Sequence, residues 1–460
     1  MKKDGFDGVI NEVERIESDY IQRLYLKILL QQPGLNDDNY ATILNLVRTE
    51  LDSDYDKAEL LLSMADRVKD DERLMEFYVD GVATIDSDYD KRRTINGLML
   101  SDDISVELLE KILTIAEDIE SDYEKAELLI DMVPHLNALD RSDPVYDRGL
   151  QSYINAAIDM DSDYETRRVL SGLSLDRNTD KKVLQEILQI AHRIDSDYEK
   201  AELLIDMSEL LGDDQDLRHT YIEAIDGVTS DYELRRIISA LSDQTDTYSH
   251  DDLEYLLELA SMMDSDYEKA ELFMELSKHC RNDEELLQQL MEGAESIDSD
   301  YDKHRVLKDF LPDDCDRQRS MGEQLLSMIE DLESGYEKAE ALLEVVHCMA
   351  EDSELRELFL DAVGSVDSDY DRQRVLSEFI DEVPMSDDLM ISILAVVEDI
   401  DSNHDKAQVL SDLADYCRGN GMLEEEFMQV VETMDSDYEM NRLYRRLYGR
   451  SAKELDDDDL

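Results

Sequence analysis

Apolar residues recur at helical spacing along the chain. Residues 183–194 carry apolar side chains at intervals of three and four, and residues 198–208 carry a second stripe of the same kind. This spacing places the apolar residues on one face of an α-helix. Only five prolines and 16 glycines occur in 460 residues, which favours helices over strands or long loops. The pattern predicts pairs of helices, each of roughly 12 to 15 residues.

The helix pairs follow a repeated motif, best seen as "IDSDYEKAELLIDM" at residues 194–207. Thirteen copies occur, 34 or 35 residues apart except for one step of 41 between Ser121 and Ser162. A period of this length is typical of an α-solenoid, whose repeats contact only their neighbours. The sequence therefore predicts an all-α solenoid of HEAT or TPR type, with about thirteen two-helix repeats over residues 1–450. The longer step predicts one lengthened loop, around His135 to Tyr146, that does not break the stack.

The serine of the motif carries the mark of a helix N-cap. An acidic residue follows it three positions later, as in Ser196 and Glu199, and this pairing predicts a capping box in which each side chain bonds the other's backbone N–H. Ser18, which is followed by Ile21, lacks the acid. The predicted caps are Ser53, Ser87, Ser121, Ser162, Ser196, Ser230, Ser265, Ser299, Ser334, Ser368, Ser402 and Ser436.

The acidic residues of the motif allow a second interpretation. Asp195, Asp197 and Glu199 have the one-three-five spacing of a calcium loop. Such a loop needs a glycine at its sixth position, whereas this chain has Lys200 there. Helix capping is the favoured interpretation, and the three carboxylates stay a weak calcium candidate.

The repeats alternate between two classes. Six residues after the serine, one class carries Glu59, Glu127, Glu202, Glu271, Glu340 or Gln408, and the other carries Arg93, Arg168, Arg236, Arg305, Arg374 or Arg442. Packed helices lie about 8–10 Å apart, so long side chains at equivalent positions reach each other. The alternation predicts an inter-repeat ladder of Glu and Arg and a super-repeat of two units, 69 residues from Ser196 to Ser265. An Arg row that clasps an anionic ligand is the alternative.

A tyrosine stands two residues after the serine in twelve of the thirteen motifs. We expect each ring to pack against the preceding helix and the next repeat, with its hydroxyl at the surface. A ladder of rings that stacks on a ligand is the alternative. The motif tyrosines are Tyr20, Tyr55, Tyr89, Tyr123, Tyr164, Tyr198, Tyr232, Tyr267, Tyr301, Tyr336, Tyr370 and Tyr438.

The charge balance restricts the possible partners. The chain has 46 Lys and Arg against 117 Asp and Glu, a formal charge of −71, while 42% hydrophobic residues suffice for a core. Direct binding of nucleic acid is disfavoured because phosphates would be repelled. A protein partner, with a basic surface or segment as one possibility, is expected instead. Solubility in a salt-rich cell is another explanation of the acidity. Residues 451–460 are expected to form a disordered acidic tail.

Catalytic motifs and targeting signals are absent from the sequence. It contains no His-Glu-x-x-His, no phosphate-binding glycine loop and no Gly-x-Ser-x-Gly. We expect no enzymatic activity, no cofactor and no bound metal. The four widely spaced cysteines predict no disulfide framework, and with no apolar run long enough for a membrane span they indicate a cytoplasmic protein without membrane association.

The segments "IDSDYEKAELL" and "SDYDRQRVLSEF" resemble the HEAT-like helical repeats that follow the membrane metallopeptidase domain of BlaR-type bacterial proteins. The resemblance extends through Leu447, but the zinc motif and membrane helices of that peptidase are absent here. It implies the repeat fold and an interaction role without protease activity. The favoured function is a non-catalytic scaffold or adaptor. The alternative is an acidic decoy or sink for basic, nucleic-acid-binding proteins.

Overall fold

A computed structural model describes residues 5–99, 105–139, 141, 144–244, 248–281, 283–311, 315–349 and 352–449. Within these ranges the chain forms twenty-seven helices and no strand, which confirms the all-α prediction. The predicted acidic tail, 451–460, lies outside the described residues. The chain divides into two compact units, Met1–Thr245 (unit 1) and Asp246–Leu460 (unit 2).

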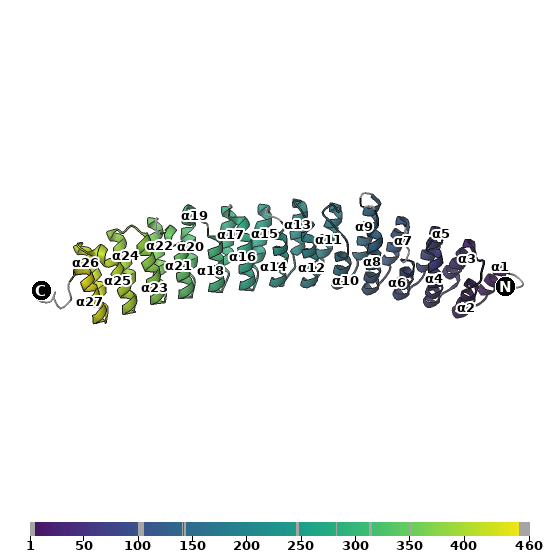
Figure 1. Cartoon of the computed structure of the whole chain (residues 1–460), viewed down its shortest axis with the longest axis horizontal. Coiled ribbons are helices and arrows are strands. Elements are labelled where there is room, and N and C mark those ends of the chain that lie inside the picture. The colour runs from purple at the N-terminus through teal and green to yellow at the C-terminus, as the bar shows by residue number, and fades with distance from the viewer. Residues whose placement is uncertain are drawn as a thin grey trace. The chain divides into compact units, whose positions relative to one another are not determined.

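Unit 1 is a tandem array of helix pairs (Figure 1). Even-numbered helices begin directly after a motif serine, and we call them motif helices. Each motif helix packs on the next motif helix, and from α3 onward each odd-numbered helix packs on the next odd-numbered one, so the unit has two layers. The helices are α1 (Gly5–Val13), α2 (Asp19–Leu30), α3 (Asp37–Glu50), α4 (Asp54–Val68), α5 (Glu72–Val82), α6 (Asp88–Leu98), α7 (Val106–Glu117), α8 (Asp122–Asn137), α9 (Pro144–Ala157), α10 (Asp163–Ser171), α11 (Lys181–His192), α12 (Asp197–Ser208), α13 (Gln215–Ile225) and α14 (Asp231–Ser242).

Unit 2 repeats this arrangement with one short additional helix, α19, before α20. Its motif helices are α16, α18, α21, α23, α25 and α27. The helices are α15 (His250–Ser261), α16 (Asp266–Cys280), α17 (Glu284–Glu295), α18 (Asp300–Phe310), α19 (Cys315–Ser320), α20 (Gly322–Glu330), α21 (Gly335–Met349), α22 (Ser353–Gly364), α23 (Asp369–Glu382), α24 (Asp387–Glu398), α25 (Asn403–Cys417), α26 (Gly421–Glu432) and α27 (Asp437–Tyr448).

The core of each unit lies between the two layers. In α11 the side chains of Ile187 and Leu188 are fully buried, and in α12 those of Ala201 and Leu204 are fully buried. These are the apolar stripes of the sequence, turned toward each other across the layers. Truncating one such leucine to alanine costs about 2–5 kcal/mol.

The predicted lengthened loop is wrong, because the insertion between Ser121 and Ser162 lengthens the helices on either side of the loop. Helices α8 and α9 have 16 and 14 residues, against 12 and 11 in α12 and α13, whereas residues 138–143 join the first pair just as six residues, 209–214, join the second. Helix α8 continues to Asn137 and includes Pro134, and α9 begins at Pro144. Helix α9 still packs on α7, and α10 still packs on α8. The stack is therefore continuous across the insertion, as the sequence predicts.

The cysteines correct one expectation. Cys315 in α19 and Cys348 in α21 form a disulfide, so the prediction that no disulfide is present is wrong. Their separation of 33 residues is close to the repeat length of 34 or 35, so the stacking of neighbouring repeats brings them together. Cys280 and Cys417 are buried and free.

Candidate interaction surface along the motif turns

Each motif turn joins the two helices of a repeat and places the serine at the start of the motif helix. The Ser196 hydroxyl accepts a hydrogen bond from the Glu199 N–H at 3.4 Å, and the twelve predicted cap serines all make this contact at 3.3–3.4 Å. Ser18, which has no acid three residues later, makes no side-chain cap hydrogen bond. The hydroxyl satisfies one of the unpaired N–H groups of the first helical turn.

The other hydrogen bond of the expected capping box, from the serine N–H to the acid three residues later, was predicted wrongly. The Ser230 N–H donates to the carboxylate of Asp197 in the preceding motif, at 2.7 Å, and not to its own Glu233. Nine serines donate in this way: Ser53, Ser87, Ser121, Ser162, Ser196, Ser230, Ser299, Ser334 and Ser402. In these nine places the aspartate after one motif serine links its repeat to the next. Sequence reasoning missed this link, although the recurrence of aspartate directly after the serine was a usable signal.

The structure gives the three calcium-candidate residues separate environments. Asp197 accepts from the backbone N–H groups of Thr229 and Ser230, and Glu199 forms an ion pair with Arg167 at 2.7 Å. Asp195 is exposed at the turn. In the part of the chain that the structure describes, no group of three or more His, Cys, Asp or Glu residues is arranged to hold a metal ion.

The predicted Glu and Arg ladder residues meet in pairs. The Arg236 guanidinium bonds Glu202 of the preceding repeat and Glu233 of its own helix, both at 2.7 Å. The same two contacts, to the preceding repeat and within the helix, are made by Arg93 with Glu59, Arg168 with Glu127, Arg305 with Glu271 and Arg374 with Glu340, while Arg442 bonds the amide of Gln408. The hydrogen bonds that Arg168 donates to the carboxylates of Glu127 and Glu165 raise its pKa above the ordinary value.

The next step along the stack uses different residues. Arg167, one position before Arg168, reaches forward to Glu199 of the following repeat. Arg23 bonds Asp56, Arg92 bonds Glu124, and His304 bonds Glu337 in the same way. The ladder therefore alternates between two kinds of pair and is not a single row. Its side chains are partly buried, which strengthens ion pairs relative to fully exposed ones.

A row of buried lysines, which sequence reasoning missed, lies beneath the motif turns. Lys200 is buried, and its Nζ donates to the carbonyls of His192 at 3.2 Å and Asp226 at 2.9 Å. These carbonyls end helix α11 and follow helix α13, so one ammonium group caps two neighbouring helix ends. Burial lowers the pKa of Lys200 below its ordinary value. Buried equivalents that also donate to backbone carbonyls are Lys57, Lys125, Lys269, Lys338, Lys406 and Arg372. Lys91 is buried at the same motif position.

The motif tyrosines correct another expectation. Their rings were predicted to be packed, but all twelve are between 51% and 76% exposed. Arginine side chains approach them at the surface: the Arg93 guanidinium lies 5.6 Å from the Tyr55 ring centroid and 5.8 Å from that of Tyr89. By contrast, Tyr78 of helix α5 is buried, and its hydroxyl donates to the Thr94 carbonyl.

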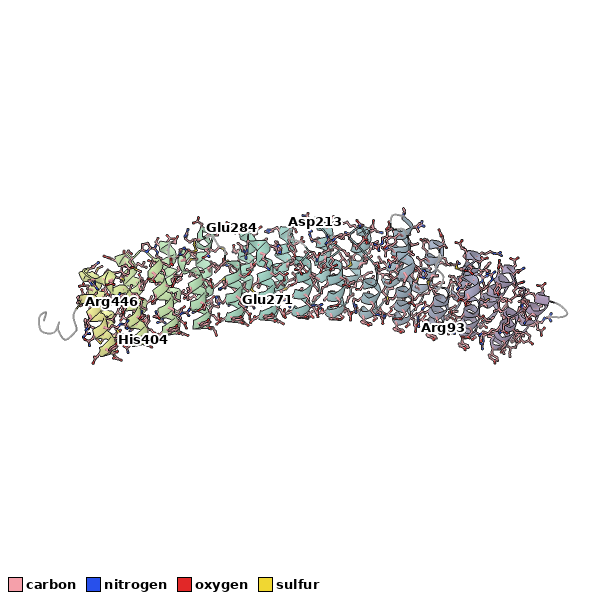
Figure 2. The ribbon with its side chains drawn as sticks, in the orientation of Figure 1. Arg93, Asp213, Glu271, Glu284, His404 and Arg446 are labelled. Carbon is pink, nitrogen blue, oxygen red and sulfur yellow. A yellow bond between two sulfur atoms is a disulfide. The ribbon has the colours of Figure 1, made fainter. Side chains whose placement is uncertain are left out.

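An exposed acid precedes the serine in most motif turns, for example Asp52, Asp86, Asp161 and Asp195. Exposed carboxylate and exposed ring thus recur together on one edge, which we call the motif-turn edge. Figure 2 shows this arrangement in unit 2, where His404, which takes the place of the tyrosine, lies at the motif-turn edge and Glu284 at the opposite edge. In unit 1, Asp213 lies at that opposite edge.

The described residues offer little for covalent chemistry. Burial raises the pKa of the Cys280 thiol to about 12 and that of the Cys417 thiol to about 11, so both are protonated at neutral pH. None of the described helices combines the length and the apolar character that a membrane span requires.

Comparisons with known proteins give structural neighbours only. No family model matches the chain, and no curated protein matches it. Solved structures with a similar fold include Kap121p bound to Nup53p (12% identity, TM-score 0.37), importin 13 in its cytosolic state (10%, 0.35) and APUM23–GGAGUUGACGG (13%, 0.25). The alignments cover 99%, 99% and 90% of this chain and 58%, 75% and 96% of those chains, so the chain spans little more than half of Kap121p. Similarities of this size carry no information on function.

Proposed function

We propose that the chain is a non-catalytic scaffold that binds protein segments on its repeated surface. The observation that carries the proposal is the motif-turn edge, where the motif tyrosine is more than half exposed in every repeat that has one. Exposed apolar surface that recurs in register is typical of interaction sites. The resemblance to the repeats of BlaR-type proteins concerns the repeat alone and is in keeping with such a role.

The alternative, an acidic decoy for basic proteins, is favoured by the net charge of −71. A decoy would gather its charge on one face. In unit 1, exposed acids stand on both edges, as Asp195 and Asp213 show. This distribution supports the scaffold over the decoy.

Affinity capture from a lysate of the source organism tests the proposal, with a disordered polyanion of equal charge as the control bait. A scaffold recovers proteins that the polyanion does not recover. Recovery of the same proteins by both baits would mean that net charge alone explains the binding, and it would contradict the scaffold.

The expected cytoplasmic location is tested separately. Disulfides are uncommon in the cytosol, so the Cys315–Cys348 bond weighs against that location. Counting free thiols in protein isolated under alkylating conditions decides the matter: four free thiols fit the cytosol, and two fit an oxidising compartment.

A further inference from the structure

Six consecutive motif turns of unit 1 expose an acid and a tyrosine three residues apart. The pairs are Glu17 and Tyr20, Asp52 and Tyr55, Asp86 and Tyr89, Glu120 and Tyr123, Asp161 and Tyr164, and Asp195 and Tyr198. The apolar residues of each motif helix fill the interior, and the tyrosine rings contact arginines at the surface, as Arg93 does with Tyr55 and Tyr89 of neighbouring repeats. Each of these turns still presents an exposed tyrosine and an exposed carboxylate to an external ligand.

The edge carboxylates differ from the acids deeper in the motif. Glu202 and Glu233 are bound to Arg236, and Asp197 is bound to the next serine. Among the ion pairs of the described residues, none includes Asp52, Asp86, Asp161 or Asp195. The edge therefore presents a row of exposed carboxylates that form no ion pair among the described residues, although the buried ammonium of Lys200 interacts electrostatically with Asp195.

The rings of the edge already bind cations within the protein. The Arg168 guanidinium lies 5.6 Å from the Tyr164 centroid, and the Arg236 guanidinium lies 5.8 Å from the Tyr232 centroid. Distances of this size are those of cation–π contacts. More than half of each tyrosine stays exposed, so the ring is accessible to a further cation from outside the protein.

The spacing of the turns limits the shape of the ligand. Packed neighbouring helices lie about 8–10 Å apart, and an extended polypeptide advances about 3.3 Å per residue. One repeat therefore matches about three residues of an extended chain.

We infer that the motif-turn edge of unit 1 binds an extended basic polypeptide segment with Arg or Lys at every third residue, one cation seated in each turn. This inference rests on the proposed scaffold function and names its partner. It also predicts that the bound segment runs along the stack, because successive cations occupy successive repeats.

Calorimetric titration of the full chain tests the inference with two synthetic peptides of equal composition. The probe is an 18-residue peptide with six arginines, one at every third position among Gly and Ser. The control peptide has its six arginines in one block.

Two variants of the protein are titrated with the same peptides. The first carries Tyr89→Ser, Tyr123→Ser, Tyr164→Ser and Tyr198→Ser, which changes no charge. The second is Asp86→Asn, Asp161→Asn and Asp195→Asn. Its matched control, Asp70→Asn, Asp213→Asn and Asp243→Asn, removes three charges from the opposite edge.

The spaced peptide is expected to bind more tightly than the blocked one. The tyrosine variant is expected to bind the spaced peptide about tenfold more weakly than the native chain, or weaker still. The Asp86, Asp161 and Asp195 variant should weaken it more than the matched control does. Unchanged melting temperatures, expected for exposed positions, show that the variants fold.

The inference would be overturned if both peptides bound with equal affinity, or if both charge variants lost the same affinity for the spaced peptide. Tighter binding of a single-stranded oligonucleotide than of the spaced peptide would overturn it as well. These outcomes leave the scaffold proposal standing if lysate capture remains specific. Failure of the scaffold proposal is seen in the capture experiment alone.

Discussion

The carboxylate of Asp197 accepts a hydrogen bond from the backbone N–H of Ser230, 2.7 Å away in the next repeat. This contact joins two helix N-termini: Asp197 is the first residue of α12, and Ser230 caps α14. A negative charge is favourable beside the positive end of either helix. The Ser-Asp pair of the motif is thus a connection between repeats as well as a helix start.

Gly335 is a natural interruption of this connection, because it stands where most motifs have aspartate. It has no positive φ, and a Cβ placed on it would lie 3.4 Å from the Ser368 backbone nitrogen and 3.5 Å from that of Asp367. Gly335→Asp is expected to restore the link and to raise the free energy of unfolding by about 1 kcal/mol over Gly335→Ala. Urea unfolding of both variants measures the difference. Equal stability of the two would contradict the role given to the aspartate.

The Arg236 and Glu202 ion pair should contribute measurably to stability. Both side chains are about one third exposed or less, at 27% and 32%. A double-mutant cycle with Arg236→Gln and Glu202→Gln is expected to give a coupling energy of about 0.5–1 kcal/mol, reduced by salt. The more exposed pair of Arg15 and Glu12, at 77% and 57%, is the control and should give a coupling near zero. Similar values for both pairs would mean that the ladder does not hold the repeats together.

Replacing Lys200 tests the buried cation beneath the turns. Lys200→Met keeps the apolar stem but leaves the carbonyls of His192 and Asp226 without their donor, at an expected cost of about 1–3 kcal/mol. Lys200→Arg should be tolerated better, because Arg372 holds the equivalent position and donates to the Val366 and Asp399 carbonyls. The two variants are compared by chemical unfolding, and a methionine variant as stable as the native chain would rule out this role.

The acid dependence of stability should include a contribution from Glu59. A hydrogen bond from Lys27 is the main cause that lowers its pKa below the ordinary value of 4.5. A carboxyl group with a lowered folded-state pKa stabilises the fold above its unfolded-state pKa and loses this effect as the pH falls through the folded-state pKa. Glu59→Gln is therefore expected to be less stable than the native chain at pH 7, with a gap that narrows below pH 4.5.

The matched control for this measurement is Glu76→Gln, which removes an exposed carboxylate of helix α5. Its stability relative to the native chain should change little over the same pH range. A gap for Glu59→Gln that does not depend on pH would contradict the assignment.

The helices and their caps could be predicted from the sequence because they depend on local signals. Apolar spacing of three and four marks a helical face, and a serine followed by an acid marks a helix start. The pairing of Glu202 with Arg236 followed from one further step, since a fixed period brings equivalent positions together in a stack.

The contacts that the sequence did not reveal depend on geometry between repeats. The carboxylate of Asp197 could have bonded its own helix, a cation or the next repeat, and only the relative placement of two turns decides among them. The sequence pattern predicts that Lys200 is a surface residue of an amphipathic helix, yet its Nζ donates to carbonyls at the ends of two helices. The motif tyrosines were expected to pack against the preceding helix and the next repeat, whereas at the second residue of the motif helix they remain more than half exposed.

Hydrogen–deuterium exchange of the full chain, with and without the spaced arginine peptide, tests the central claim most directly. The account predicts slower exchange on binding in the motif turns of unit 1, such as 51–55, 85–89 and 194–198, and no change in the connections at the opposite edge, such as 209–214. Slower exchange at the opposite edge, or spread evenly over both edges, would contradict it.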